Sequence, residues 1–406
     1  MRRLLKILAI ALLVVVAGLG LFLGYVAVTG IPKYEPRRLE IRVPVTPEKV
    51  ERGRKYALIL CAECHRDPTT RSLTGKRLVD LPPEFGVAYS KNITRDSVKG
   101  IGRWTDGELI YLLRTGVDRT GQYLPPWMPK FPNLSDDDLE GIIAFLRSDD
   151  PLVAPVAADP PGVTRPSYLS KLLTHTVFRP LPYPKTRIVA PPAAEKVAYG
   201  RYLSSSLGCF SCHSADFKTM NELEPEKSKG YMGGGNPLYD QTGAVVRSAN
   251  ITFDEETGIG KWSEADFARA LRAGVRPDRK VLLYPMTPIP ELTEADAAAL
   301  YAYLKTVPRI RNAVARPQYR AAADASEGKK LYYRYGCTSC HGEKGLGIAD
   351  LRQATQHYPT DASLEAWIKN PSAFKPGTRM PTWEGVIPES EFPALIEYVK
   401  ELGRKS

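Results

Sequence analysis

The sequence predicts an all-α protein in which three tandem helical domains follow an amino-terminal transmembrane helix. The pattern Cys-x-x-Cys-His occurs three times, and a helix-like stretch precedes each copy. Each of the three units also closes on a segment with apolar residues at helical spacing. The expected organisation is an anchor over residues 1–30, helical domains over 47–150, 193–307 and 326–405, and a proline-rich linker over 151–192.

The amino-terminal segment has the length and composition of a membrane span. After Arg2, Arg3 and Lys6, residues 7–28 carry no charge, and a helix of about 22 residues is about 33 Å long. A cleavable signal peptide has a shorter apolar core and a small-residue cleavage site, of which Ala27-Val-Thr29 is a poor version. We therefore expect residues 7–28 to contact membrane lipid as an uncleaved single-pass anchor, with a cleaved signal as the alternative.

The first unit opens and closes on predicted helices. Thr46-Pro47 begins a helix that leads to Cys61, because proline suits a first helical turn. Gly53 within it suggests close packing against another helix. The closing helix follows Ser135-Asp-Asp-Asp138, where a serine three residues before an acid resembles a capping box. Its apolar face consists of Leu139, Ile142, Ile143 and Leu146.

The second and third units repeat this plan. Their opening helices contain Gly200 and Gly328 ahead of the cysteines. Their closing helices carry the apolar residues Leu300, Tyr303 and Leu304, and Leu395, Tyr398 and Val399. We therefore expect the two terminal helices of each unit to cross.

Units one and two share an insert that unit three lacks. Asn92-Ile-Thr94 and Asn250-Ile-Thr252 each precede Gly-Ile-Gly, a tryptophan and a capped helix that ends in Leu-Arg-x-Gly-Val. This similarity indicates an internal duplication. Residues 151–192 contain ten prolines and should lie extended against both domains, with a short helix around 168–174 as an alternative. A shorter linker over about 308–325 precedes unit three.

All six cysteines belong to the three Cys-x-x-Cys-His motifs. This spacing is typical of covalent haem attachment, in which two thioethers hold the porphyrin and the histidine binds the iron. A structural zinc site usually needs paired motifs, and a disulfide framework does not require a histidine after every second cysteine. The sequence thus predicts three covalently bound haem c groups, attached at Cys61, Cys64 and His65, at Cys209, Cys212 and His213, and at Cys337, Cys340 and His341.

A methionine in a proline-rich loop follows each motif and is the expected sixth iron ligand. These residues are Met128, Met286 and Met380. Methionine is common where a high potential is required, and flanking prolines reduce the cost of ordering the loop. Core packing is the usual role of a lone methionine. Met220 and Met232 are competing candidates for the sixth ligand of the second haem. His175 and His357 lie outside the motifs and could replace a methionine, although a solvated or hydrogen-bonded role is more typical.

The overall composition is that of a globular protein. Charged residues make up 25% of the chain, hydrophobic residues make up 43%, and the formal net charge is +11. Basic runs interleaved with aromatic residues are absent from the sequence, so we expect no nucleic-acid partner.

With these motifs, residues 47–405 resemble a triple class I cytochrome c. Units one and two are similar to the multihaem cytochrome subunits of membrane-bound alcohol and gluconate dehydrogenases, through Asn-Ile-Thr, Gly-Ile-Gly-x-Trp and the Pro-Met loop. Unit three, with Trp367-Ile-Lys-Asn-Pro371 and Met380-Pro381, resembles small bacterial electron-carrier cytochromes. The resemblance implies haem c with His/Met ligation and assembly outside the cytoplasmic membrane. The haem domains should therefore lie on its periplasmic side.

The expected function is electron transfer rather than enzymatic catalysis. The donor would be a dehydrogenase or a quinol-oxidising complex, and the acceptor an oxidase or a soluble cytochrome. A haem peroxidase is the alternative, but it needs an iron with an open site and nearby acid–base residues. A haem-based sensor would usually carry a signalling domain. A methionine candidate for every haem favours the electron carrier.

Overall fold

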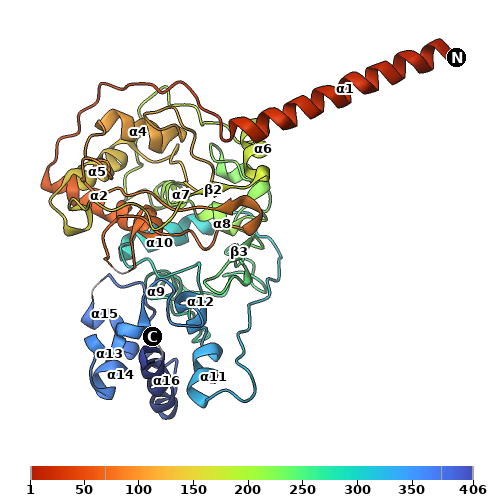
Figure 1. Cartoon of the computed structure of the whole chain (residues 1–406). Helices are drawn as coiled ribbons and strands as arrows, with labels where there is room; N and C mark the ends of the chain where they lie inside the picture. Colours follow the sequence, from red (N-terminus) through yellow and green to blue (C-terminus); the bar gives the residue numbers. More distant parts are fainter. Residues whose placement is uncertain (1, 69, 376, 405–406) are drawn as a thin grey trace.

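The computed structural model describes residues 2–68, 70–375 and 377–404. Met1 and Lys405, the expected outer ends of the anchor and of the third domain, lie outside the described residues. Figure 1 shows helix α1 (Arg2–Thr29) projecting away from the body, while the carboxy-terminal helices, in blue, form the opposite end of the body.

The remaining elements follow the expected units. Unit one contains α2 (Pro47–Leu60), α3 (Ala62–His65), η1 (Pro83–Phe85), β1 (Gly86–Val87), α4 (Asp106–Thr115) and α5 (Asp136–Arg147). The linker contains η2 (Pro151–Val153), β2 (Arg165–Pro166) and α6 (Tyr168–Thr176). Unit two contains α7 (Lys196–Ser206), α8 (Cys209–His213), η3 (Phe217–Thr219), η4 (Pro225–Lys227), β3 (Pro237–Tyr239), β4 (Val245–Arg247), α9 (Glu264–Ala273) and α10 (Glu294–Leu304). Unit three contains α11 (Glu327–Arg334), α12 (Cys337–His341), η5 (Leu351–Gln353), α13 (Ala354–His357), α14 (Asp361–Lys369), α15 (Pro371–Phe374), η6 (Glu389–Glu391) and α16 (Phe392–Arg404).

The chain is mostly helical, as expected, with one long apolar helix at its amino terminus. Among the described residues, two small antiparallel ribbons are an addition to the all-α prediction. In one, Gly86 pairs with Pro166, because the linker returns along unit one in an extended conformation. In the other, Leu238 pairs with Val246 within unit two. The linker also forms helix α6, as in the alternative interpretation of that segment.

The opening and closing helices of each unit cross at a glycine, as the sequence predicted. A Cβ atom at this glycine would collide with a backbone carbonyl group of the closing helix. The three pairs are Gly53 with Gly141 of α5, Gly200 with Ala299 of α10, and Gly328 with Ala394 of α16. The helix axes can approach this closely only where the side chain is absent.

Units one and two share one continuous hydrophobic core, whereas unit three has its own. The shared core runs from Val43 to Val307 and includes residues of all four terminal helices of the two units. The core of unit three draws in Val281 from unit two. The sequence suggested three separate helical domains, but the first two pack as one body. Apolar residues on a helix predict burial and do not identify the partner that buries them.

Candidate haem-attachment sites

Each Cys-x-x-Cys-His motif lies at a helical turn directly after a longer helix. Within these turns the first cysteine, the second cysteine and the histidine occupy positions i, i+3 and i+4, which share one helix face. In the first motif, the His65 backbone N–H donates to the Cys61 carbonyl oxygen over 2.9 Å. The fold thus directs two thiols and one imidazole to the same side at each of the three places.

Two of the three motif histidines are held by a backbone carbonyl group. Nδ1 of His65 lies 2.7 Å from the Lys91 oxygen, and Nδ1 of His213 lies 2.8 Å from the Ala249 oxygen. Nδ1 must carry the proton in both contacts, which leaves Nε2 with a free lone pair. Burial lowers the pKa of both histidines, so both rings are neutral near pH 7. A neutral imidazole with an exposed Nε2 lone pair is suited to binding iron.

The third motif histidine is held less firmly. Burial lowers the pKa of His341 to about 4, and the Ala349 backbone has a smaller, opposite effect. Nδ1 of His341 is buried but makes no hydrogen bond of normal geometry to a described residue. The ring is therefore neutral, but its orientation depends on the surrounding cavity rather than on a carbonyl partner.

The Asn-x-Thr loops place the carbonyl groups that hold the first two histidines, since Lys91 and Ala249 directly precede the two asparagines. Asn92 Oδ1 accepts hydrogen bonds from the backbone N–H and hydroxyl of Thr94, over 2.9 and 2.7 Å. Its amide donates to the carbonyl groups of Val156 and Ala158. Asn250 makes the same turn with Thr252 and donates to Ile310. Both asparagines therefore fix a turn and bind the segment that leaves the unit.

The methionine loops are attached to helix ends in the same way in all three units. Three residues after each methionine, a backbone N–H donates to a carbonyl group near the carboxyl end of a helix. The bonds are Phe131 to Leu113 of α4 (2.8 Å), Ile289 to Leu271 of α9 (2.8 Å), and Trp383 to Lys369 of α14 (3.0 Å). Met128, Met286 and Met380 thus occupy equivalent places in three loops of different length.

Met232, a competing ligand for the second haem, occupies a core position. It is fully buried, and its carbonyl oxygen accepts a bond from Ile251 over 2.9 Å. In unit one, Leu73 is the equivalent buried residue, with a bond of the same length from Ile93. Since leucine fills the same place in unit one, Met232 is explained by packing. Met220 is half-buried against the same core.

The two histidines outside the motifs have other partners. Nε2 of His175 lies 2.9 Å from the carbonyl oxygen of Gly30, at the end of α1. Nδ1 of His357 lies 3.0 Å from the Gln353 carbonyl oxygen in an exposed position on α13. Neither histidine is among the residues that line the cavity at the third motif.

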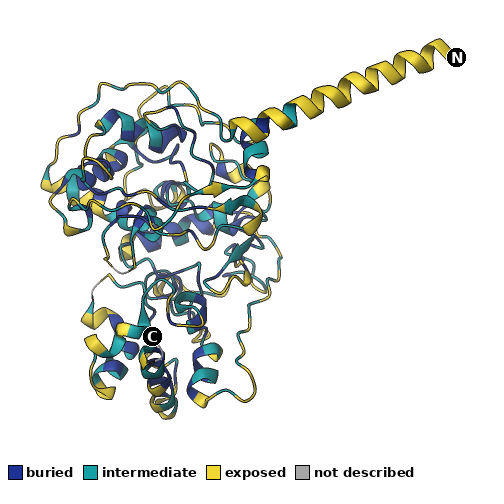
Figure 2. Ribbon diagram, in the orientation of Figure 1, coloured by how far each residue is buried: buried dark blue, intermediate teal, exposed yellow. Residues whose placement is uncertain are grey.

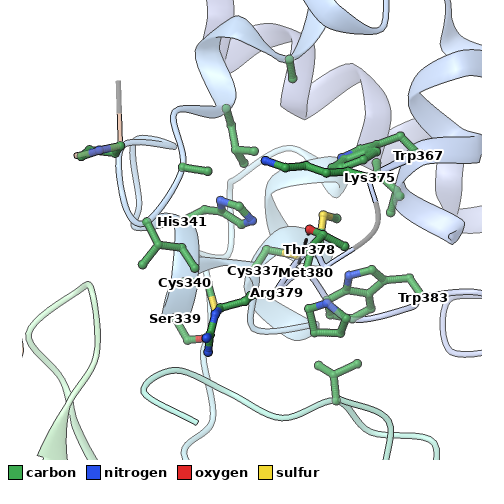
Figure 3. A pocket seen from close by; sticks show the side chains of 18 of the residues that line it. Cys337, Ser339, Cys340, His341, Trp367, Lys375, Thr378, Arg379, Met380 and Trp383 are labelled. Carbon is green, nitrogen blue, oxygen red and sulfur yellow. Dashed lines mark hydrogen bonds between the residues drawn. The ribbon is translucent and has the colours of Figure 1, made fainter. Parts of the chain in front are cut away.

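The third motif and its methionine line one cavity of about 240 Å³. Figure 3 shows the His341 ring and the Met380 side chain extending into it, with Trp367 and Trp383 nearby and Cys337 and Cys340 at its edge. Two thiols, a neutral imidazole and a thioether around an aromatic-lined cavity are the groups that a covalently attached haem requires. The residues present therefore fit this cofactor.

Parts of units one and two complete the wall of that cavity. Its lining includes Ala62, Glu63 and Arg66 of unit one and Leu282 of unit two. Arg379, directly before Met380, donates to the carbonyl group of Leu58 in unit one over 2.7 Å. Its Nη2 atom also lies 3.6 Å from Oε2 of Glu291 in unit two. The sequence alone did not single out Arg379, because its partners are distant in the chain.

The second cysteine of each motif lies within electrostatic reach of Glu63, Asp80 or both. Burial raises the pKa of Cys64 to about 12, and both carboxylates act in the same direction. Burial also raises the pKa of Cys212, with a contribution from Asp80. The pKa of Cys340 is raised by burial to about 11, with a contribution from Glu63. The first motif therefore shares Asp80 with the second motif and Glu63 with the third.

Residues 325–403 match the family model of cytochrome c. The chain contains a cytochrome c domain. This domain holds the third motif, Met380 and the cavity between them. The match supports covalent haem c as the cofactor type, in agreement with the chemistry of the cavity.

Longer matches relate the chain to cytochrome subunits of dehydrogenases. It is 29% identical to the gluconate 2-dehydrogenase cytochrome c subunit of Pantoea cypripedii, over 74% of this chain and 70% of the relative. It is 28% identical to the cytochrome c subunit of a quinone-dependent alcohol dehydrogenase of Gluconacetobacter polyoxogenes, over 72% and 64%. A nicotinate dehydrogenase subunit of Pseudomonas putida is 30% identical over 77% of this chain, which spans only 26% of that protein. Cytochrome subunits transfer electrons, which agrees with the prediction that the chain is not an enzyme.

Proposed function

We propose that the protein is a membrane-anchored triheme c-type cytochrome that transfers electrons from a respiratory donor to a downstream acceptor. The threefold equivalence of the sites carries this proposal. In each unit a Cys-x-x-Cys-His turn follows a crossing helix, and a methionine loop is bonded to the end of another helix. A chance arrangement would not repeat both features in loops of different length. Similarity to cytochrome subunits of dehydrogenases supports a dehydrogenase as one partner.

The proposed ligand pairs are His65 with Met128, His213 with Met286, and His341 with Met380. Bound haem would supply one-electron oxidation and reduction at its iron. The chain positions the ligands: the carbonyl groups of Lys91 and Ala249 hold the Nδ1 protons of two histidines, so that each Nε2 stays available. At the third site, Trp367 and Trp383 contribute apolar surface that excludes water. A low-polarity environment with thioether ligation favours the ferrous state and a high potential.

The arrangement of the motifs favours electron exchange among the three sites. Cys64 lies near both Glu63 and Asp80, Cys212 lies near Asp80, and Cys340 lies near Glu63, so the first motif shares one carboxylate neighbour with each of the other two. The backbone N–H of Gln241 in unit two also donates to the carbonyl group of Ser339 within the third motif, over 3.2 Å. We infer that electrons pass among neighbouring haem edges inside the protein and leave to a partner such as an oxidase or a soluble cytochrome.

Helix α1 is proposed to remain in the mature protein as an anchor in the cytoplasmic membrane. It is long and apolar enough to cross a membrane, and Figure 2 shows it exposed except where it meets the body. At that junction Val26 is fully buried, and Tyr168 donates to the Leu23 carbonyl oxygen over 2.8 Å. The body thus makes specific contacts with the end of α1. A signal peptide that is removed after export would not need such contacts. The haem-binding units would then face the periplasm.

The number of haem groups in the mature protein tests this proposal. Intact-mass analysis of protein purified from membranes should give the full chain with three covalently added haem groups. The double variant Cys61→Ala/Cys64→Ala and its counterparts in the second and third motifs should each lose one. Fewer than three groups in the wild-type protein would overturn the triheme assignment. A mass that begins near residue 30 would instead contradict the anchor and leave the haem count intact.

Partner identity can be tested on the same preparation. Co-purification from gently solubilised membranes should recover a dehydrogenase or a quinol-oxidising complex. When that complex and its substrate are added to the purified cytochrome, the haem groups should be reduced within one catalytic turnover of the complex. Slow reduction that does not depend on the donor would contradict the proposed role.

A further inference from the structure

Helix α6 buries small polar residues against the body and leaves apolar residues exposed near both of its ends. Its small polar residues face the body: Ser170 is 2% exposed and donates to the Phe85 carbonyl oxygen over 2.7 Å, and Thr174 is fully buried. Leu169 is 40% exposed and Val177, which directly follows the helix, is 62% exposed, while Leu172 and Leu173 are half-buried. A surface helix in water normally buries its apolar side and exposes its polar side.

The position of α6 along α1 explains this exposure of apolar residues. Tyr168 bonds to Leu23, and the edge of the His175 ring packs against Tyr25 with 5.5 Å between ring centroids. Leu23 precedes the end of the charge-free run at Val28 by five residues, which is about 7–8 Å along a helix. Helix α6 therefore begins at a level that lies inside the apolar part of α1.

We propose that α6 is an interfacial helix that inserts its outward face into the lipid leaflet on the side of the haem-binding units. This inference rests on the proposed membrane anchor. Interfacial helices bury their apolar side about 5–10 Å below the headgroup boundary, a depth that matches the position of Tyr168 beside Leu23. Helix α1, which packs against α6, also exposes apolar residues, and Leu21 is 77% exposed.

The charges at the rim of α6 fit phosphate headgroups. Lys171 is half-buried on the helix, and Arg179 is exposed just beyond it. Arg179 donates to the carbonyl group of His175 over 2.7 Å. Within the described part of the chain, neither cation forms an ion pair with a carboxylate. Aromatic residues are also common at this depth, and Tyr25 and Tyr168 lie at the junction of the two helices.

Spin labels can test the location of α6 in the holoprotein. Haem attachment occupies the native cysteines, so an introduced cysteine is the one free thiol. Leu169→Cys and Val177→Cys probe the outward face, Leu21→Cys in α1 is the lipid control, and Val245→Cys, 51% exposed on β4, is the aqueous control. Each labelled protein is placed in nanodiscs of phosphatidylcholine and phosphatidylglycerol. The ratio of collisions with oxygen to collisions with a nickel chelate then reports immersion in lipid.

The ratio at positions 169 and 177 should exceed that at 245 severalfold and approach that at 21. Water-like ratios at 169 and 177, together with a lipid-like ratio at 21, would overturn the interfacial helix and leave the anchor intact. Low access to both reagents at 169 and 177 would indicate contact with protein and would also overturn it. A water-like ratio at 21 would show instead that the proposed anchor itself is wrong.

Discussion

Lys55 of unit one donates a hydrogen bond to Asp296 of unit two over 2.7 Å. The duplicated contact on the other side of the interface joins Tyr202 of unit two to Asp138 of unit one. Lys55 and Tyr202 each follow the crossing glycine of their opening helix by two residues. Each aspartate follows the cap of its closing helix by three residues. The two units therefore face each other through a pseudo-twofold interface in which the donor is a charged lysine on one side and a neutral tyrosine on the other.

Replacing Lys55 by methionine should destabilise the joint core of units one and two. The Asp296 side chain is only 4% exposed and would lose its cationic partner, while the Lys55 side chain is 23% exposed, so solvent screens part of the effect. We expect a loss of about 1–3 kcal/mol in the free energy of unfolding. Denaturation followed by far-ultraviolet circular dichroism measures it. Lys99→Met removes an exposed pair with Asp159 and should cost less than about 1 kcal/mol.

Acid should weaken the same interface. Burial opposes ionisation of Asp296, but the hydrogen bonds from Lys55 and Thr293 outweigh it and hold its pKa below the usual 3.8. A carboxyl group with a lowered pKa in the folded state stabilises the protein above pH 3.8, and this contribution is lost as the pH falls through the folded-state pKa. Stability should therefore fall below about pH 4, and Asp296→Asn should show a flatter dependence. An unchanged pH slope in that variant would exclude Asp296 as a source of acid sensitivity.

Local patterns in the sequence predicted the local structure well. The crossing glycines, the capped helices that follow Ser135 and Thr293, and the mainly helical chain are all present. These features depend on a few neighbouring residues and on helical periodicity. The equivalent methionine loops also follow from spacing and proline content, although their attachment to helix ends becomes visible only in three dimensions.

Contacts between units could not be read from the sequence. Nothing near Arg379 in the chain indicates that it bonds to Leu58, because more than three hundred residues separate the two. The joint core of units one and two has the same origin, since an apolar helix face is compatible with several partners. The Asn-x-Thr motif indicated a duplication in the sequence, but its role in forming a turn is visible only from the hydrogen bonds of the asparagine side chains.

Truncation of the three loop methionines should separate ligands from core residues. Met128→Ala, Met286→Ala and Met380→Ala should each remove about a third of the iron–thioether charge-transfer band and lower the potential of one haem. Met232→Leu is the matched control, because leucine fills the equivalent core place at position 73. It should leave the band and all potentials unchanged. Loss of the band in Met232→Leu, with no loss in Met286→Ala, would reverse the assignment at the second site.

Arg114 is expected to position Met128 without contacting the haem. Its fully buried guanidinium group donates to the carbonyl oxygens of Phe131 and Leu134, over 2.7 and 2.6 Å, and to Asp136 over 2.6 Å. These bonds fix the end of the loop that begins at Met128. Arg114→Gln should loosen that loop, which weakens the iron–thioether bond at one haem. The result should be a smaller charge-transfer band and a lower potential for that haem alone.

A purely structural role for Arg114 would give a different outcome. It would lower the unfolding midpoint while the band and the three potentials stayed at their wild-type values in the folded protein. Arg114→Lys retains the charge and one of the donors and should therefore restore part of the band if positioning is the cause. Arg119→Gln, on the exposed surface beside Trp104, controls for the loss of a positive charge in the same unit. Spectroelectrochemical titration of the four proteins distinguishes these cases, because only a displaced thioether changes the band and the potential together.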